Sequence, residues 1–230
     1  MKNYHDFFIS PEGGAWDDNT ELHPMIDFSS DTILHDYIMM TEALNHVDYW
    51  LIVFCGHGYV NANDDTVLCM KDGSKVTGAQ IKNMGKISPP RTLIVDCCRE
   101  KDELDIPLLL DESLFSDTDM KLNAQACKTL YNRILESLPS GTFYEAYSTS
   151  IGECTGDTDT VGGVYSYNLL KIADETKRLL MGGCLSGGDN LATLRQIHDA
   201  ATPYVVQMRK DRQHLCRSDN TNRIPFVVIA

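Results

Sequence analysis

The sequence predicts an α/β fold in which a mostly parallel sheet is covered by helices. Short apolar runs bounded by polar or glycine-rich segments alternate with longer stretches whose apolar residues recur every three or four positions. The chain has 230 residues, of which 43% are hydrophobic, so it can bury a sizeable core. We therefore expect one domain spanning residues 1–230.

Five apolar runs are predicted to be strands. Each is shorter than a stable free helix, and polar or glycine-rich segments bound it. The runs lie at residues 7–9, 49–55, 92–95, 143–147 and 225–230. Ligands of mostly parallel sheets bind beyond the carboxyl ends of the strands. The loops that follow these runs are therefore where we expect the functional site.

The longer stretches are predicted to be amphipathic helices. Apolar residues fall on one helical face in residues 31–46, 122–138 and 165–179. A further stretch at 190–208 contains Pro203, where we expect the helix to kink or restart. The acidic segment 100–120 has little helical pattern and is predicted to be an exposed loop.

Charge and cysteine usage exclude several classes of protein. The formal charge of −13, from 20 Lys and Arg against 33 Asp and Glu, opposes nucleic-acid binding and favours a positively charged substrate. No apolar stretch is long enough to span a membrane, and the N-terminus lacks the apolar region of a secretory signal. The eight cysteines have no metal-binding spacing, so we expect reduced thiols, no metal site and a cytoplasmic protein.

A histidine and two cysteines follow two of the predicted strands. The run 49–55 leads into Gly56-His57-Gly58, and about 40 residues later the run 92–95 leads into Asp96-Cys97-Cys98. A thiol becomes a good nucleophile near neutral pH when a base lies within hydrogen-bonding distance. From placement alone an alternative stays open, in which His57 is an ordinary turn residue and both cysteines pack in the core.

This pair of strand ends resembles the catalytic signature of the caspase and metacaspase peptidases, in which a Gly-His-Gly turn precedes an Asp-x-Cys triplet. Further resemblances lie at residues 7–18, 143–153, 162–170 and 223–230, in the family's order. The resemblance implies a caspase-like fold with a large-subunit-like part at about 1–120 and a small-subunit-like part at about 140–230. It also implies a cysteine endopeptidase that requires no metal or organic cofactor.

The resemblance assigns roles to individual residues. Cys98, third in its triplet, matches the nucleophile, and His57 matches the histidine that transfers protons. The amides of Gly58 and Cys98 are then expected to hold the oxyanion. Three departures are evident: Arg99 stands where metacaspases usually have Ser, the segment between the first strand and His57 is short for the family, and the acidic loop after the histidine is reduced to residues 61–65. Calcium activation therefore stays an open alternative.

Substrate choice is predicted from charge. In the family, the residue two positions before the nucleophile lines the pocket for the side chain preceding the cut, and here it is Asp96. The turn after the first strand supplies a second acid in metacaspases, which matches Asp18, with Asp17 as the alternative. Two carboxylates predict a protein or peptide substrate cut after Arg or Lys, as in metacaspases.

Three alternatives stay open in this interpretation. Asp96 could serve only as a helix cap. Asp157 and Asp159 are interpreted as an exposed acidic loop, with calcium binding or a place in the substrate pocket as alternatives. The whole chain could be a catalytically silent caspase-like module that binds a partner through the same cleft. The sequence does not determine the oligomeric state.

Overall fold

The computed structural model describes residues 2–22, 48–83, 89–101, 121–158, 162–183, 190–218 and 223–230. The helix predicted at 31–46 lies outside these residues, as does the acidic segment from residue 102 to residue 120. Within the described residues, no helix is long and apolar enough to cross a membrane.

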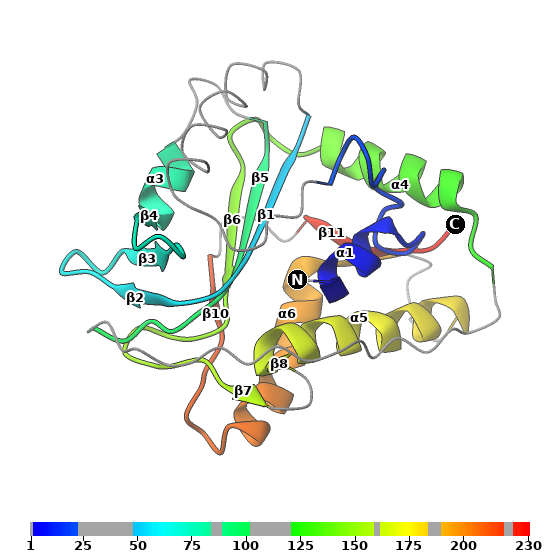
Figure 1. Ribbon diagram of the computed structural model, residues 1–230. Helices are drawn as coiled ribbons and strands as arrows, with labels where there is room; N and C mark the ends of the chain where they lie inside the picture. Colours follow the sequence, from blue (N-terminus) through cyan, green and yellow to red (C-terminus); the bar gives the residue numbers. More distant parts are fainter. Residues whose placement is uncertain are drawn as a thin grey trace.

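A four-stranded sheet in the order β1-β5-β6-β10 forms the centre of the molecule (Figure 1). Its strands are β1 (Trp50–Cys55), β5 (Arg91–Asp96), β6 (Phe143–Tyr147) and β10 (Cys216–Arg217). The first three are parallel, and β10 pairs antiparallel with β6. The predicted α/β class with a mostly parallel sheet is confirmed, and three of the predicted runs are its parallel strands.

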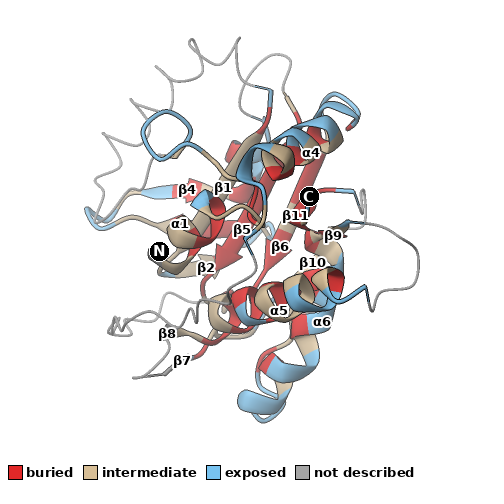
Figure 2. Ribbon diagram, turned by 90° about the vertical axis from the view of Figure 1, so that its right-hand side faces the viewer, coloured by how far each residue is buried: buried red, intermediate tan, exposed pale blue. Residues whose placement is uncertain are grey.

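Both faces of this sheet are covered, as expected from the continuous apolar sequence of β5. Ile94 faces a core built with α1 (Lys2–Ile9), α4 (Ala124–Glu136), α5 (Val164–Met181) and α6 (Leu194–Met208). Leu93 and Val95 face the opposite core, which contains Leu68, Val76 and Ile81. These side chains come from β3 (Thr66–Cys69), β4 (Lys75–Thr77) and α3 (Gly78–Asn83). Figure 2, viewed onto the helix-covered face, shows β5 and β6 as largely buried strands.

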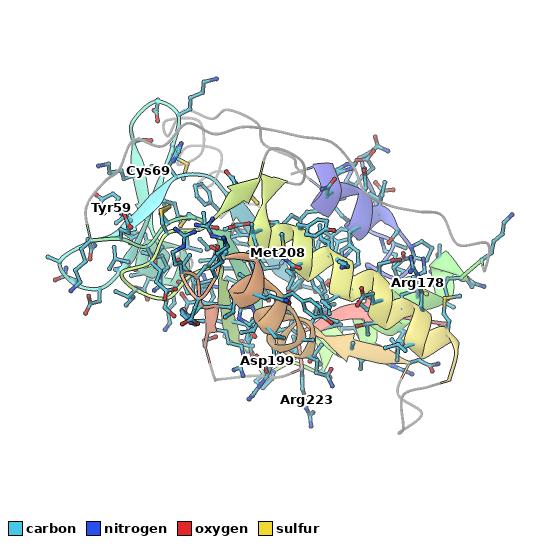
Figure 3. All side chains as sticks on the ribbon, turned by 90° about the horizontal axis from the view of Figure 1, so that it is seen from below. Tyr59, Cys69, Arg178, Asp199, Met208 and Arg223 are labelled. Carbon is cyan, nitrogen blue, oxygen red and sulfur yellow. A yellow bond between two sulfur atoms is a disulfide. The ribbon has the colours of Figure 1, made fainter. Side chains whose placement is uncertain are left out.

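The second layer is a small antiparallel sheet that extends from the end of β1. It has the order β2-β3-β4, with β2 at Gly58–Val60. Figure 3 shows this layer from below, with Tyr59 and Cys69 at one end of the molecule and Arg178 of α5 at the other. The candidate histidine lies in the connection between β1 and this small sheet, so the sheet determines where the histidine is placed.

The first predicted strand, residues 7–9, is wrong: these residues end helix α1. Tyr4, Phe7 and Phe8 are all buried, and spacings of three and four residues place them on one helical face. Phe7 packs on Phe226, with ring centroids 4.8 Å apart. A run of three apolar residues is too short to distinguish a strand from the end of a helix.

Helices α4, α5 and α6 lie in predicted helical segments, whereas α3 was not predicted. Helix α4 begins after Asn123, whose side chain accepts a hydrogen bond from the Ala126 N–H, and α5 covers the segment predicted from 165. Helix α6 passes through Pro203 without restarting, contrary to one expected outcome.

Two strands pair outside the central sheet. Strand β9 (Leu191–Thr193), which precedes α6, pairs antiparallel with β11 (Pro225–Val228). The terminal apolar run is therefore a strand, but it pairs outside the central sheet. A short hairpin of β7 (Asp157–Thr158) and β8 (Gly162–Gly163) precedes α5.

A buried histidine in α6 predicts how stability depends on pH. His198 is 1% exposed, and its Nδ1 lies 2.9 Å from the Tyr165 hydroxyl. Burial lowers the pKa of His198 to about 4, below the ordinary value of 6.5. Below about pH 6.5 the unfolded chain therefore binds a proton at this histidine that the folded chain does not bind.

We expect the free energy of unfolding to fall by up to about 3 kcal/mol from His198 alone as the pH falls from about 6.5 to about 4. Urea unfolding at several pH values, compared between the wild type and His198→Gln, measures this contribution. The variant cannot take up the proton, so its stability should depend less on pH. Equal pH dependence in the two proteins would contradict the assignment.

Candidate active site

The carboxyl ends of β1 and β5 bring the two predicted segments side by side. Cys55 pairs with Asp96 in the parallel register. Beyond this pair, the Gly56 N–H donates to the Asp96 carbonyl at 3.1 Å, and the Val60 N–H donates to the Glu100 carbonyl at 2.8 Å. The chain from 56 to 60 therefore runs alongside the chain from 96 to 100. His57 and Gly58 lie on the first segment, opposite Cys97 and Cys98 on the second.

The backbone N–H of Gly58 faces the segment that carries the cysteines. Gly58 pairs with Leu68 of β3, and the neighbouring Cys69 N–H donates to the His57 carbonyl at 2.9 Å. Antiparallel ladders alternate between bonded and non-bonded pairs, so the Gly58 N–H points away from β3, on the same side as that of Val60. A Cβ at position 58 would lie 2.5 Å from the Cys97 Sγ, which explains the glycine.

The two adjacent cysteines have different environments. Cys97 is 0% exposed, and its thiol donates to the Cys98 carbonyl at 3.2 Å. Burial, followed by the nearby Asp96 carboxylate, raises the pKa of the Cys97 thiol strongly, which disfavours the thiolate. Cys98 is half-buried, and its Sγ is bonded to the Sγ of Cys154.

The expectation that all the cysteines are reduced is therefore wrong for Cys98 and Cys154. These residues are 56 positions apart, and their Cα atoms are 4.1 Å apart. The loop after β6 brings Cys154 there, because the Arg99 N–H donates to the Glu153 carbonyl and the Gly152 N–H donates to the Arg99 carbonyl, both at 2.8 Å. Cys55, Cys97, Cys127 and Cys216 are free thiols.

Asp96 is buried at the end of β5, and its carboxylate caps a helix distant in the sequence. Its Oδ1 accepts from the Thr155 hydroxyl at 2.8 Å, and its Oδ2 accepts from the Ser166 N–H at 3.0 Å and the Ser166 hydroxyl at 2.5 Å. Ser166 lies in the first turn of α5, whose N-cap residue, Gly163, has no side chain to serve as a cap. Asp96 therefore satisfies a free N–H at the positive end of this helix.

A second carboxylate, that of Asp157, lies near Asp96. A Cβ at Gly163 would lie 2.5 Å from Oδ2 of Asp96 and 3.6 Å from Oδ1 of Asp157. Although Asp157 keeps an exposed surface, the surrounding protein and then Asp96 raise the pKa of its carboxyl, while His57 and Arg209 act in the opposite direction. Asp96 and Asp157 therefore form a pair of neighbouring carboxylates beside Gly163.

A family model described as the caspase domain matches residues 25–224, a range that includes both strand ends and the acidic pair. The chain belongs to the caspase-domain family. Members of this family are cysteine peptidases that act on protein substrates. The architecture is similar to the crystal structure of caspase-1 from Spodoptera frugiperda, with a TM-score of 0.55 and 13% identity over 99% of this chain and 78% of that chain. A search of curated proteins found no match.

The acids predicted near the N-terminus of this caspase domain are used elsewhere. Oδ1 of the exposed Asp17 accepts hydrogen bonds from the Asn19 N–H and from the Thr20 N–H and hydroxyl in its own turn. Asp18 contacts Nε2 of His5 at 2.6 Å. No contact among the described residues joins either acid to Asp96. The prediction placed these acids in the turn after a strand at residues 7–9. Residues 7–9 instead end helix α1, so the turn that follows does not lead toward Asp96 as predicted.

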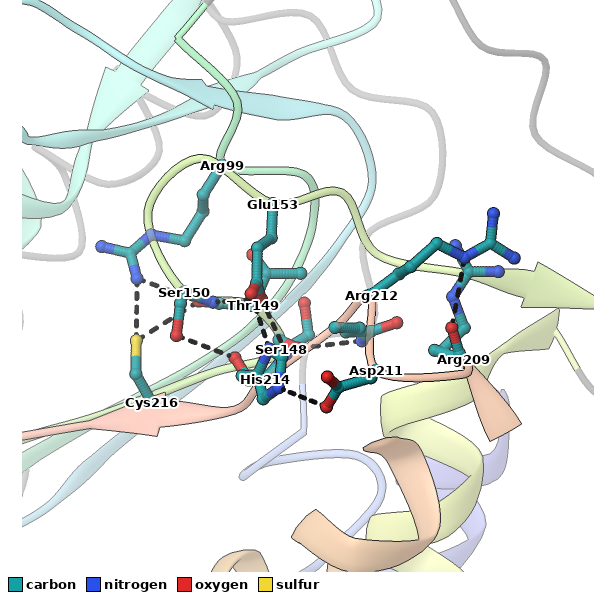
Figure 4. Close-up of polar contacts among 11 residues, drawn as sticks. Arg99, Ser148, Thr149, Ser150, Glu153, Arg209, Asp211, Arg212, His214 and Cys216 are labelled. Carbon is teal, nitrogen blue, oxygen red and sulfur yellow. Dashed lines mark hydrogen bonds and ion pairs between the residues drawn. The ribbon is translucent and has the colours of Figure 1, made fainter. Parts of the chain in front are cut away.

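Arg99, the residue after Cys98, is a buried structural cation. It donates to the Thr149 carbonyl at 3.0 Å and to the Cys216 Sγ at 2.8 Å (Figure 4). Its Nε donates to the Thr66 hydroxyl at 2.9 Å, and its guanidinium lies 4.2 Å from the centroid of the Tyr147 ring. Arg99 thus connects β3, β6 and β10 directly after the candidate nucleophile.

Proposed function

We propose that this caspase domain is a cysteine endopeptidase of metacaspase-type specificity that cleaves after Arg or Lys, with Cys98 as the nucleophile and His57 as the general base. The observation that carries the proposal is the pairing of the segments after β1 and β5. It places His57 and the Gly58 N–H on one side and Cys98 on the other. A base, a thiol and an amide donor at one sheet edge are the groups that acyl transfer requires.

The proposed mechanism uses groups of this chain. The reduced Cys98 thiol loses its proton to His57 and attacks the scissile carbonyl. The negative charge that develops on the carbonyl oxygen is held by the N–H groups of Gly58 and Cys98. His57 then gives its proton to the leaving amine, and water releases the acyl group from Cys98. Cys97 takes no part, because it is buried in the core.

The charge near the nucleophile supports basic specificity. Asp96 lies two residues before Cys98, and Asp157 lies on the hairpin that precedes α5. We assign the second pocket acid to Asp157 rather than to Asp18 or Asp17, because the carboxylates of Asp157 and Asp96 both lie beside Gly163. Two carboxylates attract a guanidinium or ammonium group and repel an acidic side chain.

Hydrolysis of a peptide library that varies the residue before the cut tests this proposal, with the protein reduced by a dithiol. We expect cleavage after Arg and Lys and none after Asp. A preference for Asp would overturn the specificity. Absence of cleavage of every peptide, with free Cys98 verified by mass spectrometry, would overturn the peptidase function and favour a catalytically silent binding module.

A further inference from the structure

We propose that the bond between Cys98 and Cys154 is a reversible redox switch that holds this peptidase inactive until a dithiol reduces it. The inference rests on the proposed function, because it takes Cys98 as the nucleophile. A sulfur in a disulfide has no thiolate to attack a carbonyl, so the bonded form cannot begin the reaction. Reduction supplies the thiol that the mechanism needs.

The loop that carries Cys154 is held in place by contacts other than the disulfide. On one side it is bonded to Arg99 through the backbone groups of Gly152 and Glu153. On the other side, the Gly156 N–H donates to the Gln213 Oε1 at 2.9 Å, and the Gln213 Nε2 donates to the Ser148 carbonyl at 2.8 Å. Reduction therefore frees Cys98 while the loop keeps its position.

A charged cluster strengthens this attachment at the residue next to Cys154. The Glu153 Oε2 accepts from the His214 N–H at 2.7 Å, and its Oε1 lies 2.7 Å from the His214 ring (Figure 4). The other ring nitrogen of His214 lies 3.0 Å from Asp211. Glu153 and Asp211 raise the pKa of His214, and His214 helps to lower the pKa of Glu153. With the loop kept beside β5, Cys154 stays close to Cys98 after reduction, so the bond can form again.

The partial exposure of the two cysteine residues also fits a reversible bond. Cys98 and Cys154 are half-buried, and the neighbouring residues Ile151 and Gly152 are exposed, so a small dithiol can approach. Cys55 is a poor alternative disulfide partner for Cys98. Burial and then the Asp96 carboxylate raise the pKa of the Cys55 thiol to about 12. Thiol exchange proceeds through thiolates, so the choice of partner favours Cys154.

The redox step balances with a dithiol and its cyclic disulfide as the partners. In reduction, a thiolate of the dithiol attacks the Cys154 sulfur, the bond to Cys98 breaks, and Cys98 leaves as a thiolate. The second thiol of the dithiol then displaces Cys154 and closes the cyclic disulfide. Two electrons and two protons pass from the dithiol to the two cysteines. The reverse exchange with the cyclic disulfide restores the bond.

The test equilibrates the protein in buffers with increasing ratios of reduced to oxidised dithiothreitol. Two readouts are taken: alkylation of Cys98 by iodoacetamide, mapped by mass spectrometry, and cleavage of a fluorogenic Arg peptide. In the wild type we expect both to rise together by at least about tenfold across the series. Cys154→Ser should be alkylated and active at every ratio. Cys216→Ser, a matched half-buried thiol variant, should follow the wild type.

Each outcome decides a different point. If the 98–154 bond does not form at any ratio, or if the bonded protein cleaves as fast as the reduced protein, the switch is overturned. If Cys98 alkylation follows the redox ratio and neither form cleaves any peptide, the proposed peptidase function fails while the redox switch of the Cys98 thiol stands. Peptide mapping of the wild type decides the linkage even if Cys154→Ser fails to fold.

Discussion

Cys98→Ala is expected to lower kcat/KM for an Arg peptide by about 10⁴-fold or more, whereas Cys97→Ala should retain activity within several fold. Removal of the nucleophile leaves no group to form the acyl intermediate. Cys97 instead packs in the core beside Gly58, with its sulfur away from solvent. Both variants and the wild type are assayed after reduction by a dithiol, so that the wild-type Cys98 is a free thiol.

Two controls separate chemistry from folding in this comparison. Circular dichroism and thermal unfolding should show that both variants fold, with a modest loss of stability for Cys97→Ala because it leaves a small cavity. His57→Ala should also lose cleavage, while Cys98 in that variant can still be alkylated slowly. If Cys97→Ala abolished cleavage and Cys98→Ala retained it, with both proteins folded, the nucleophile assignment would be wrong.

Asp157→Asn is expected to lower kcat/KM for Arg and Lys peptides by tens to hundreds of fold, equivalent to about 2 to 4 kcal/mol. The loss follows because one of two carboxylates near the bound cation is neutralised. The matched control is Asp18→Asn, since this exposed acid pairs with His5 and should leave cleavage unchanged. Alkylation of Cys98 should change much less than cleavage in the wild type and in both variants, because each protein keeps the Cys98 thiol and His57.

Asp96→Asn should show a comparable loss together with lower stability. This acid accepts hydrogen bonds from Thr155 and Ser166 and caps α5, so its replacement also weakens the start of that helix. Thermal unfolding measures the second effect, and the ratio of Arg cleavage to Cys98 alkylation isolates the first. Unchanged Arg cleavage in both Asp157→Asn and Asp96→Asn would exclude the acidic pocket. A large loss in Asp18→Asn alone would restore the acid predicted from the sequence.

The strands and helices that position His57 and Cys98 follow from local patterns in the sequence. The apolar runs before His57 and before Asp96 predict β1 and β5, because a buried parallel strand needs apolar side chains on both faces. Parallel strands end at the same edge of a sheet, so the sequence predicts that both segments lie at that edge, whereas the pairing of β1 with β5 comes from the structure. The apolar spacing in α4 and α5 likewise predicts the helices that cover one face.

Contacts between distant segments were decided only by the tertiary structure. The Cys98–Cys154 bond, the cap that Asp96 provides for α5 and the place of Asp157 beside Asp96 all depend on where the loop and hairpin after β6 lie. Local periodicity reports which face of an element is buried, but it does not report which loops meet at the end of a sheet. The position of Asp18 was mispredicted for the same reason. The three-residue apolar run at 7–9 predicted a strand, whereas these residues end a helix, and Asp18 after it contacts His5. Secondary structure depends on side chains a few positions apart, whereas the charge and redox state of this site depend on segments brought together by the packing of the whole chain.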